Sequence, residues 1–244
     1  MAVHISQISK SFLLPHERRG TLKNHFIHLF RGRLRYERFH ALTEVSFDLK
    51  EGEWIGMIGS NGSGKSTLLK IISGIFEPDA GTVEYKGRSI PFLELGAGLH
   101  PELTVRDNIF MNSILLGMTK REVNKRFDEI LDFAELRNFV DQQLKNISSG
   151  MKLRLAFAVA LTIEAELYLI DEIMSVGDYN FQKKSLSALK EKAHGKNLIF
   201  VSHDLEQVEQ LCHRVVWLNK GRVMMYDRPE KVIPAYKAYS NNPS

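Results

Sequence analysis

The sequence predicts an α/β fold built on a parallel sheet, and three observations support this. Short apolar runs at residues 54–58 (WIGMI), 167–170 (LYLI) and 197–202 (NLIFVS) have the length and composition of buried strands. Segments with helical periodicity separate these runs, and strands that alternate with helices imply a parallel sheet. A helical pattern from about residue 104 to 161 interrupts the alternation, so it predicts a subdomain inserted into the order of the sheet.

The remaining elements follow in chain order. Residues 3–12 form a predicted strand that ends at Phe12, and residues 41–58 contain two strands separated by a Glu-Gly turn. The Pro-Asp-Ala-Gly and Lys-Gly punctuation of residues 74–98 predicts a short hairpin or meander. A helix is expected at about 181–194, and the last residues, SNNPS, are expected to form a loose tail.

Composition limits the class of protein. A chain of 244 residues is long enough for one large domain with a sizeable core. The apolar run at residues 155–163 is far shorter than the roughly 18 residues of a membrane span, and the N-terminus lacks the apolar core of a signal peptide. The single cysteine, Cys212, forms no internal disulfide and is expected to be a small core residue. We therefore expect a cytoplasmic protein.

The net charge of +4 is unevenly distributed. Residues 16–38 contain seven Lys or Arg and two Asp or Glu, which gives +5, so the other 221 residues sum to −1. A uniformly basic surface would indicate nucleic acid, whereas a local basic segment with apolar residues indicates a membrane face or a protein partner. The sequence therefore predicts no nucleic-acid partner.

The stretch GSNGSGKST matches the phosphate-binding loop G-x-x-x-x-G-K-[ST] at every specified position, and it lies at a strand-to-helix junction as that motif requires. Its glycines allow successive N–H groups to point inward, and the new helix adds a positive partial charge, so a triphosphate fits the loop. Lys65 is expected to contact the outer phosphates, and the Ser66 hydroxyl is the expected Mg²⁺ ligand. The predicted phosphate-binding residues are Gly59, Ser60, Asn61, Gly62, Ser63, Gly64, Lys65, Ser66 and Thr67.

Two acids follow the predicted strand at 167–170, at the strand end where open α/β sheets place their ligands. Asp171 is placed to hold Mg²⁺, and Glu172 is placed to orient or polarise an attacking water. By itself such a pair is more often a solvated helix cap. Its distance from the phosphate loop favours the catalytic interpretation.

Taken together, five segments resemble the nucleotide-binding subunit of ATP-binding-cassette (ABC) transporters: GSNGSGKST, ISSGMKLRLAFAVAL (147–161), LYLIDE (167–172), SVGD (175–178) and VSHD (201–204). The resemblance covers most of the chain. It implies a P-loop NTPase (RecA-like) fold: a mixed sheet core, an antiparallel β meander and the inserted helical subdomain. It also implies an ATPase that uses ATP and Mg²⁺.

The resemblance implies further site residues. Ser148, Ser149 and Gly150 correspond to the family signature that contacts the γ-phosphate held by a second copy of the chain. A plain helix cap is the alternative interpretation for this short sequence. His203 corresponds to the family's switch histidine, Asp178 to an aspartate that touches the other subunit, and Phe12 to the aromatic that stacks on adenine, with a core aromatic as its alternative.

The family pattern is not followed everywhere. Where many members carry Gly-Gly-Gln in the signature, this chain has Ser149, Gly150 and Met151. Where many members carry a glutamine after the meander, this chain has none, and Glu94 is the nearest polar side chain. The role of Glu94 at Mg²⁺ or water stays open.

These departures resemble one branch of the family, the ATPases that export lipid-linked polysaccharides such as O-antigen, capsular polysaccharide or teichoic acid. That branch also carries a basic helical insertion between its first two strands, expected here at 13–38. Leu22, Phe26, Leu29 and Phe30 fall on one helical face there, with arginines and a lysine around them. The insertion is expected either to meet lipid headgroups or to pack only on a permease.

The resemblance implies a homodimer that closes around two MgATP, bound to two copies of a membrane permease on the cytoplasmic face of the inner membrane. The chain ends about 40 residues after His203, so we expect no C-terminal carbohydrate-binding domain. Two rivals remain: a soluble ABC ATPase that acts on ribosomes or DNA, and a catalytically weak regulatory module.

Overall fold

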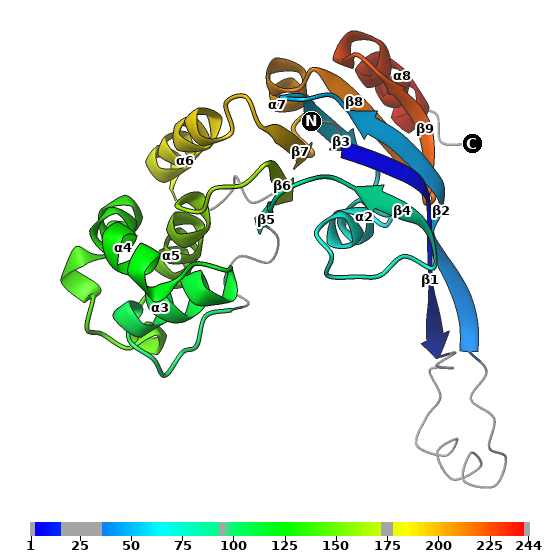
Figure 1. The fold of residues 1–244 in the computed structure, drawn as a ribbon. Coiled ribbons are helices and arrows are strands. Elements are labelled where there is room, and N and C mark those ends of the chain that lie inside the picture. Colours follow the sequence, from blue (N-terminus) through cyan, green and yellow to red (C-terminus); the bar gives the residue numbers. More distant parts are fainter. Residues whose placement is uncertain (1–2, 16–35, 93–95, 97, 172–177, 242–244) are drawn as a thin grey trace, which may run out of the picture.

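The computed structural model describes residues 3–15, 36–92, 96, 98–171 and 178–241. Its strands form two sheets (Figure 1). The six-stranded sheet has the order β5-β6-β7-β3-β8-β9, parallel except for the last pair, and the three-stranded antiparallel sheet has the order β2-β1-β4. The predicted α/β fold with a mixed sheet is confirmed.

The bounds of the elements are as follows. The strands are β1 Val3–Pro15, β2 Tyr36–Leu49, β3 Trp54–Ile58, β4 Ala80–Glu84, β5 Ser89–Phe92, β6 Leu167–Asp171, β7 Asn197–Val201, β8 Arg214–Asn219 and β9 Arg222–Asp227. The helices are α2 Lys65–Ile72, α3 Val105–Leu115, α4 Lys120–Ala134, α5 Ser149–Leu161, α6 Tyr179–Lys192, α7 Leu205–Leu211 and α8 Pro229–Asn241, with short 3-10 turns at Arg137–Phe139 and Leu144–Asn146.

Apart from Asp171 at the end of β6 and Asn197 at the start of β7, the strands β3, β6 and β7 are apolar, as is usual where both faces of a sheet are covered. Successive side chains of a strand point to opposite faces, and β6 shows the division clearly. Tyr168 and Ile170 join the core under α3 to α8, whereas Leu167 and Leu169 join the core shared with α2 and the antiparallel sheet. Because these strands are parallel, their carboxyl ends lie at the same edge of the sheet, and the sheet lies between the two cores.

The predicted helical block consists of α3, α4 and α5, which gather at one side of the molecule in Figure 1. Thr104 caps α3 by accepting the N–H of Asp107, and Ser148 caps α5 by accepting the N–H of Met151. A capping box starts α4, in which Thr119 and Glu122 satisfy each other's backbone N–H groups. Each of these helices thus begins at a residue whose side chain satisfies free backbone donors.

One predicted boundary was wrong, and of the predicted hairpin or meander the structure does not form the hairpin. The structure continues β1 to Pro15 and β2 from Tyr36, so residues 13–15 and 36–38 of the expected helical insertion are strand, and residues 16–35 lie outside the described residues. Residues 80–92 do not form a hairpin, because β4 pairs with β1 and β5 pairs with β6 in the other sheet. The physical reason is burial: Ile90 and Phe92 enter the large core, whereas β4 is mostly exposed.

The sequence analysis assigned no element between residue 204 and the predicted tail, and this region completes the sheet. The first two residues of that tail, Ser240 and Asn241, belong to α8, and the rest lies outside the described residues. Strands β8 and β9 form a hairpin whose turn residues, Lys220 and Gly221, both have positive φ, as tight two-residue hairpin turns require. Trp217 packs edge-on against Tyr236 of α8, which holds that helix on the sheet. Cys212 is buried, as predicted, and burial raises the pKa of its thiol to about 12.

Among the described residues, no helix combines the length and the apolar character that a membrane span requires.

The capping box of α4 generates a stability prediction. Thr119→Ala removes the hydroxyl that accepts from Glu122 N–H and leaves backbone donors unpaired, so we expect the free energy of unfolding to fall by about 1 kcal/mol. Chemical denaturation of the purified chain measures this. The neighbouring exposed Lys120→Ala is the control and is expected to change little, and equal effects of the two substitutions would contradict the assignment.

Candidate functional site

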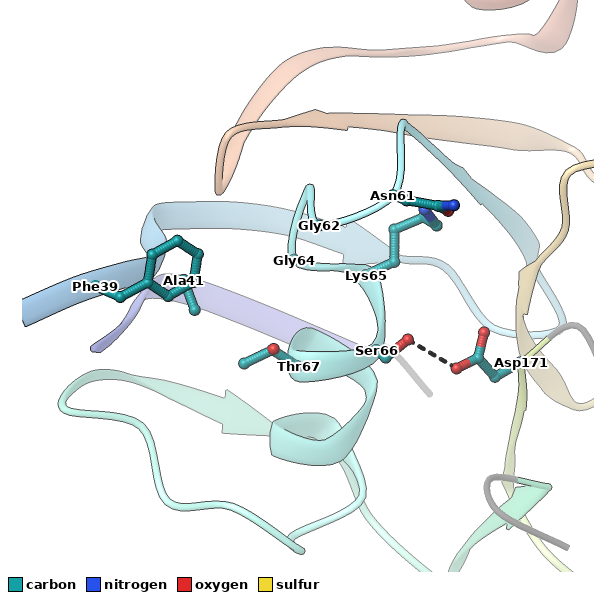
Figure 2. A pocket seen from close by; sticks show the side chains of 9 residues that line it. All are labelled: Phe39, Ala41, Asn61, Gly62, Gly64, Lys65, Ser66, Thr67 and Asp171. Carbon is teal, nitrogen blue, oxygen red and sulfur yellow. Dashed lines mark hydrogen bonds between the residues drawn. The ribbon is translucent and has the colours of Figure 1, made fainter. Parts of the chain in front are cut away.

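The site is built where β3 passes into α2. Six residues of the predicted loop line a cavity of about 420 Å³ together with Phe39, Ala41 and Asp171 (Figure 2): Asn61, Gly62, Gly64, Lys65, Ser66 and Thr67. The other three predicted loop residues, Gly59, Ser60 and Ser63, are not among the lining residues. Gly64 caps α2 with φ of 106°, and a Cβ there would approach Ala41 O to 2.7 Å. Both the backbone angle and the close approach require glycine. The predicted loop therefore has the conformation that exposes the N–H groups of the first turn of α2.

The back of the loop is held by elements far away in sequence. Gly221 in the β8–β9 turn donates its N–H to Ser63 O at 3.0 Å, and its carbonyl accepts from Thr43 N–H at 2.8 Å. A Cβ on Gly59 would lie 2.2 Å from Leu218 O. The loop is thus fixed from behind by the C-terminal hairpin and by β2, a support that the sequence analysis missed because no local motif marks it.

Lys65 folds over the loop. It is buried, and its Nζ donates to the carbonyl oxygens of Gly59 at 2.8 Å and Ser60 at 3.0 Å. Ser63 Oγ is also buried, and it has no hydrogen-bond partner among the described residues. Ser63 does not line the cavity, whereas Lys65 does, so the ammonium of Lys65 and the N–H groups at the start of α2 are the groups that fit an anionic ligand.

Ser66 and Asp171 meet at one end of the cavity. Ser66 Oγ donates to Asp171 Oδ2 at 2.9 Å, as the dashed line in Figure 2 shows. One residue comes from the first turn of α2 and the other from the end of β6. Hydroxyl and carboxylate oxygens are the ligands that Mg²⁺ prefers, so the chemistry of this pair fits the predicted metal.

His203 belongs to the same edge of the sheet. In the register, Val201 at the end of β7 lies beside both Asp171 of β6 and Met57 of β3. His203 follows two residues later, is exposed and precedes Asp204, which caps α7. Glu172, directly after Asp171, lies outside the described residues, as does Glu94.

Ser148, Ser149 and Gly150 do not line this cavity. They form the exposed N-terminus of α5 in the helical block, which Figure 1 shows well away from α2. Asp178 also lies outside the cavity, where it caps α6 by accepting Phe181 N–H at 3.0 Å. That hydrogen bond, and the nearby charge of Arg154, lower the pKa of the Asp178 carboxyl.

The aromatic residue that lines the cavity is Phe39, which is 47% exposed, rather than Phe12. The Phe12 ring is half-buried and packs edge-on against Phe76 at a centroid distance of 5.9 Å. Phe39 and Phe12 are cross-strand partners. In Figure 2, Phe39 and Asp171 lie at opposite ends of the loop. Phe39 stands 20 positions before Gly59 in the sequence, and no local motif marks it as a site residue.

The fold and this site define a P-loop nucleotide-binding domain, and comparison with known proteins places it in a family. A family model described as ABC transporter matches residues 42–175, more than half of the chain. The chain is 38% identical, over 96% of its length and 97% of the relative's, to the O-antigen export system ATP-binding protein RfbB of Klebsiella pneumoniae. The chain belongs to the ABC transporter family, in the polysaccharide-export branch that the sequence predicts.

Further comparisons agree. The teichoic acids export ATP-binding protein TagH of Lactococcus lactis is 41% identical over 82% of this chain, which spans 43% of that relative. The ATP-binding cassette MJ0796, solved as a dimer in a post-hydrolysis state with ADP and Pi, superposes with a TM-score of 0.72 at 25% identity and covers 93% of this chain. The chain covers 98% of that structure. The predicted P-loop ATPase class is confirmed.

The two phenylalanines generate a prediction. Stacking of a base on an aromatic ring contributes about 1–3 kcal/mol, so Phe39→Ala is expected to raise the ATP dissociation constant about tenfold. Phe12→Ala is the matched control on the paired strand and is expected to affect ATP binding little. Titration with a fluorescent ATP analogue measures both. A larger effect of Phe12→Ala would favour the original assignment of the adenine to Phe12.

Proposed function

We propose that this chain is the ATP-hydrolysing subunit of an ABC exporter that moves a lipid-linked polysaccharide across a membrane. The observation that carries the chemical part is the contact between Ser66 and Asp171 beside a complete phosphate loop. The transport part rests on relatives whose names state O-antigen or teichoic acid export.

The chain's own groups suit the binding of a nucleotide triphosphate. The N–H groups at the start of α2 and the Lys65 ammonium would neutralise the phosphates. Among the described residues, no three His, Cys, Asp or Glu side chains converge on one point. Ser66 and Asp171 would therefore hold Mg²⁺ together with phosphate oxygens and water, as is usual for this ion. When bound, Mg²⁺ would offset charge on the phosphates that react.

The hydrolytic step needs a group that orients water toward the γ-phosphate. Glu172 is our candidate, because it follows Asp171 at the end of β6 and would face the same edge of the sheet. His203 follows the neighbouring strand β7, and a hydrogen bond from its ring to the γ-phosphate would report whether that phosphate is present.

A second copy would complete each site. Residues 148–150 lie outside the cavity of their own chain, yet they form a capped helix N-terminus of the kind that binds anions. The similar cassette MJ0796 is a dimer. We therefore infer that two copies close head-to-tail, each placing residues 148–150 and Asp178 against the nucleotide of the other. ATP would shift the population toward this closed dimer, and a permease would respond to the change.

The names of the relatives, which state export, support a partner in the membrane. We propose that the subunit binds two copies of an integral permease at the cytoplasmic face of the membrane. The basic segment at 18–38 would lie near lipid-linked phosphate headgroups, and recognition of the glycan would rest on that region and the permease. An O-antigen is the substrate we favour, with a capsular polysaccharide or a teichoic acid as alternatives.

A soluble ABC ATPase is the rival function. It predicts that the chain stays out of the membrane fraction when a candidate permease is co-expressed. Stable co-sedimentation with membranes that depends on the permease would exclude it.

Glu172 provides the test of hydrolysis. Glu172→Gln keeps the size of the side chain but removes the carboxylate that would polarise water, so we expect turnover to fall by roughly 10²–10⁴-fold while ATP binding persists. Steady-state ATPase assays and gel filtration with ATP measure the two effects, and the variant is expected to accumulate as a dimer.

Glu209→Gln, at an exposed position on α7, is the control for the loss of one carboxylate and is expected to hydrolyse ATP normally. Normal turnover in the Glu172→Gln variant would contradict the catalytic assignment.

Lys65 provides the test of transport. Lys65→Ala removes the cation of the phosphate loop, so ATP binding and export are expected to stop together. We expect a lipid-linked glycan to accumulate on the cytoplasmic side, and extraction with mass spectrometry would identify the glycan and its carrier. Normal surface polysaccharide in cells that carry only this variant would exclude the exporter function.

A further inference from the structure

Arg154 joins three helices. Two of them, α5 and α6, begin at residues that the proposed function places against the nucleotide of a second copy. Arg154 lies on α5, shortly after the helix N-terminus at residues 148–150. Asp178, at the start of α6, is one of its partners, and Glu135, at the end of α4, is the other. None of these three residues lines the nucleotide cavity.

The contacts of Arg154 use both ends of its planar guanidinium. Nη1 donates to Glu135 Oε2 at 2.8 Å, and Nη2 donates to Asp178 Oδ2. The guanidinium carbon lies 4.8 Å from the centre of the Phe181 ring. Its side chain is only 18% exposed, so these charge-assisted hydrogen bonds are partly shielded from water. A lysine could not bridge two carboxylates with this geometry.

The surroundings make the junction stiff. Lys184 of α6 donates to Glu135 Oε1 at 3.1 Å and to the Phe133 carbonyl at 2.9 Å, so α6 is tied to the end of α4 as well. Beneath these charges, the rings of Phe133, Phe157 and Phe181 contact one another at centroid distances of 5.8–6.3 Å. One aromatic ring comes from each of the three helices.

We propose that Arg154 is a positioning residue that holds Asp178 and the N-terminus of α5 in one fixed arrangement, so that a second copy of the chain meets them as a single surface. This inference rests on the proposed function, because residues 148–150 and Asp178 are the parts expected to face the partner's nucleotide. Loss of Arg154 leaves each part folded and keeps the aromatic contact between Phe157 and Phe181, but it removes the polar contacts that fix Asp178 relative to the N-terminus of α5.

Two steps can be measured separately: the binding of ATP to one chain and the closure of two chains around it. Binding of ATP to the phosphate loop of one chain does not involve Arg154, so it is expected to survive the loss of this residue. Closure of the two-copy site needs both parts in place, so it is expected to weaken. A residue that merely stabilises the fold would lower the melting temperature without separating these steps.

The experiment uses full-length chain in the Glu172→Gln background, where ATP is expected to hold the dimer. Arg154→Gln is compared with Arg137→Gln, whose arginine also binds two carboxylates, Asp128 and Asp132, but only at the end of α4. The ATP dissociation constant is measured below the dimerisation concentration, and the dimer dissociation constant is measured by sedimentation. In the otherwise unsubstituted chain, kcat and KM are measured for the same variants.

We expect Arg154→Gln to raise the dimer dissociation constant about tenfold, because a change of this size lies within the usual coupling energies of residues in contact. The ATP dissociation constant of the monomer is expected to change by no more than about twofold. Arg137→Gln is expected to leave both unchanged. Because Arg154 acts through Asp178, adding Arg154→Gln to Asp178→Asn is expected to cause little further loss. Arg154→Lys keeps the charge and is expected to recover only part of the dimerisation.

Three results would overturn the inference: normal dimerisation of Arg154→Gln, an equal loss of ATP affinity in the monomer, or effects of Arg154→Gln and Asp178→Asn that multiply. If Arg154→Gln does not fold, Arg154→Lys carries the same comparison, and its full dimerisation counts against the inference. If the Glu172→Gln parent itself forms no dimer with ATP, the proposed function fails and takes the inference with it.

Discussion

The hydrogen bond from Ser66 to Asp171 is the contact on which the site depends. It joins the first turn of α2, which follows β3, to the end of β6, and β7 lies between β3 and β6 in the sheet. The two residues are 105 positions apart in the sequence. It forms only if β3, β6 and β7 end level with one another, as their register shows. That register in turn depends on the alternation that divides the side chains of each strand between two cores. The packing of the whole sheet therefore determines the position of Asp171 relative to Ser66 and the phosphate loop.

The same architecture keeps apart, within one chain, the two helix N-termini that we propose meet at one nucleotide in the dimer. Helix α2 belongs to the core shared with the antiparallel sheet, whereas α5 is packed among α3, α4 and α6. Packing of α5 on the other side of the sheet keeps residues 148–150 out of the cavity. A helix end exposed in this way is available to a second molecule, and the dimeric relative MJ0796 shows that cassettes of this fold do pair.

The sequence predicted well where a local pattern decides the structure. The phosphate loop, the buried strands and the cap at Ser148 follow from spacing and residue type within a few positions. It failed where a distant partner decides. No residue near position 89 indicates that β5 pairs with β6 rather than with β4. No residue near Gly221 indicates that its N–H donates to Ser63 O in the phosphate loop. Phe39 was missed for the same reason, because its place beside the phosphate loop depends on the pairing of β1 with β2 and not on its neighbours in sequence.

Asp178 shows how an assignment from a motif changes when contacts are known. The resemblance gives this aspartate one role, a contact with the other subunit. In the structure, one of its oxygens accepts the Phe181 N–H and the other accepts Arg154. A carboxylate has lone pairs to spare beyond these two bonds, so a partner's donor must approach an anion that is already oriented by its own chain. Because the Asp178 carboxylate is already fixed by its own chain, it loses less conformational entropy when a second copy binds. This makes association of the two copies more favourable than it would be with a mobile carboxylate.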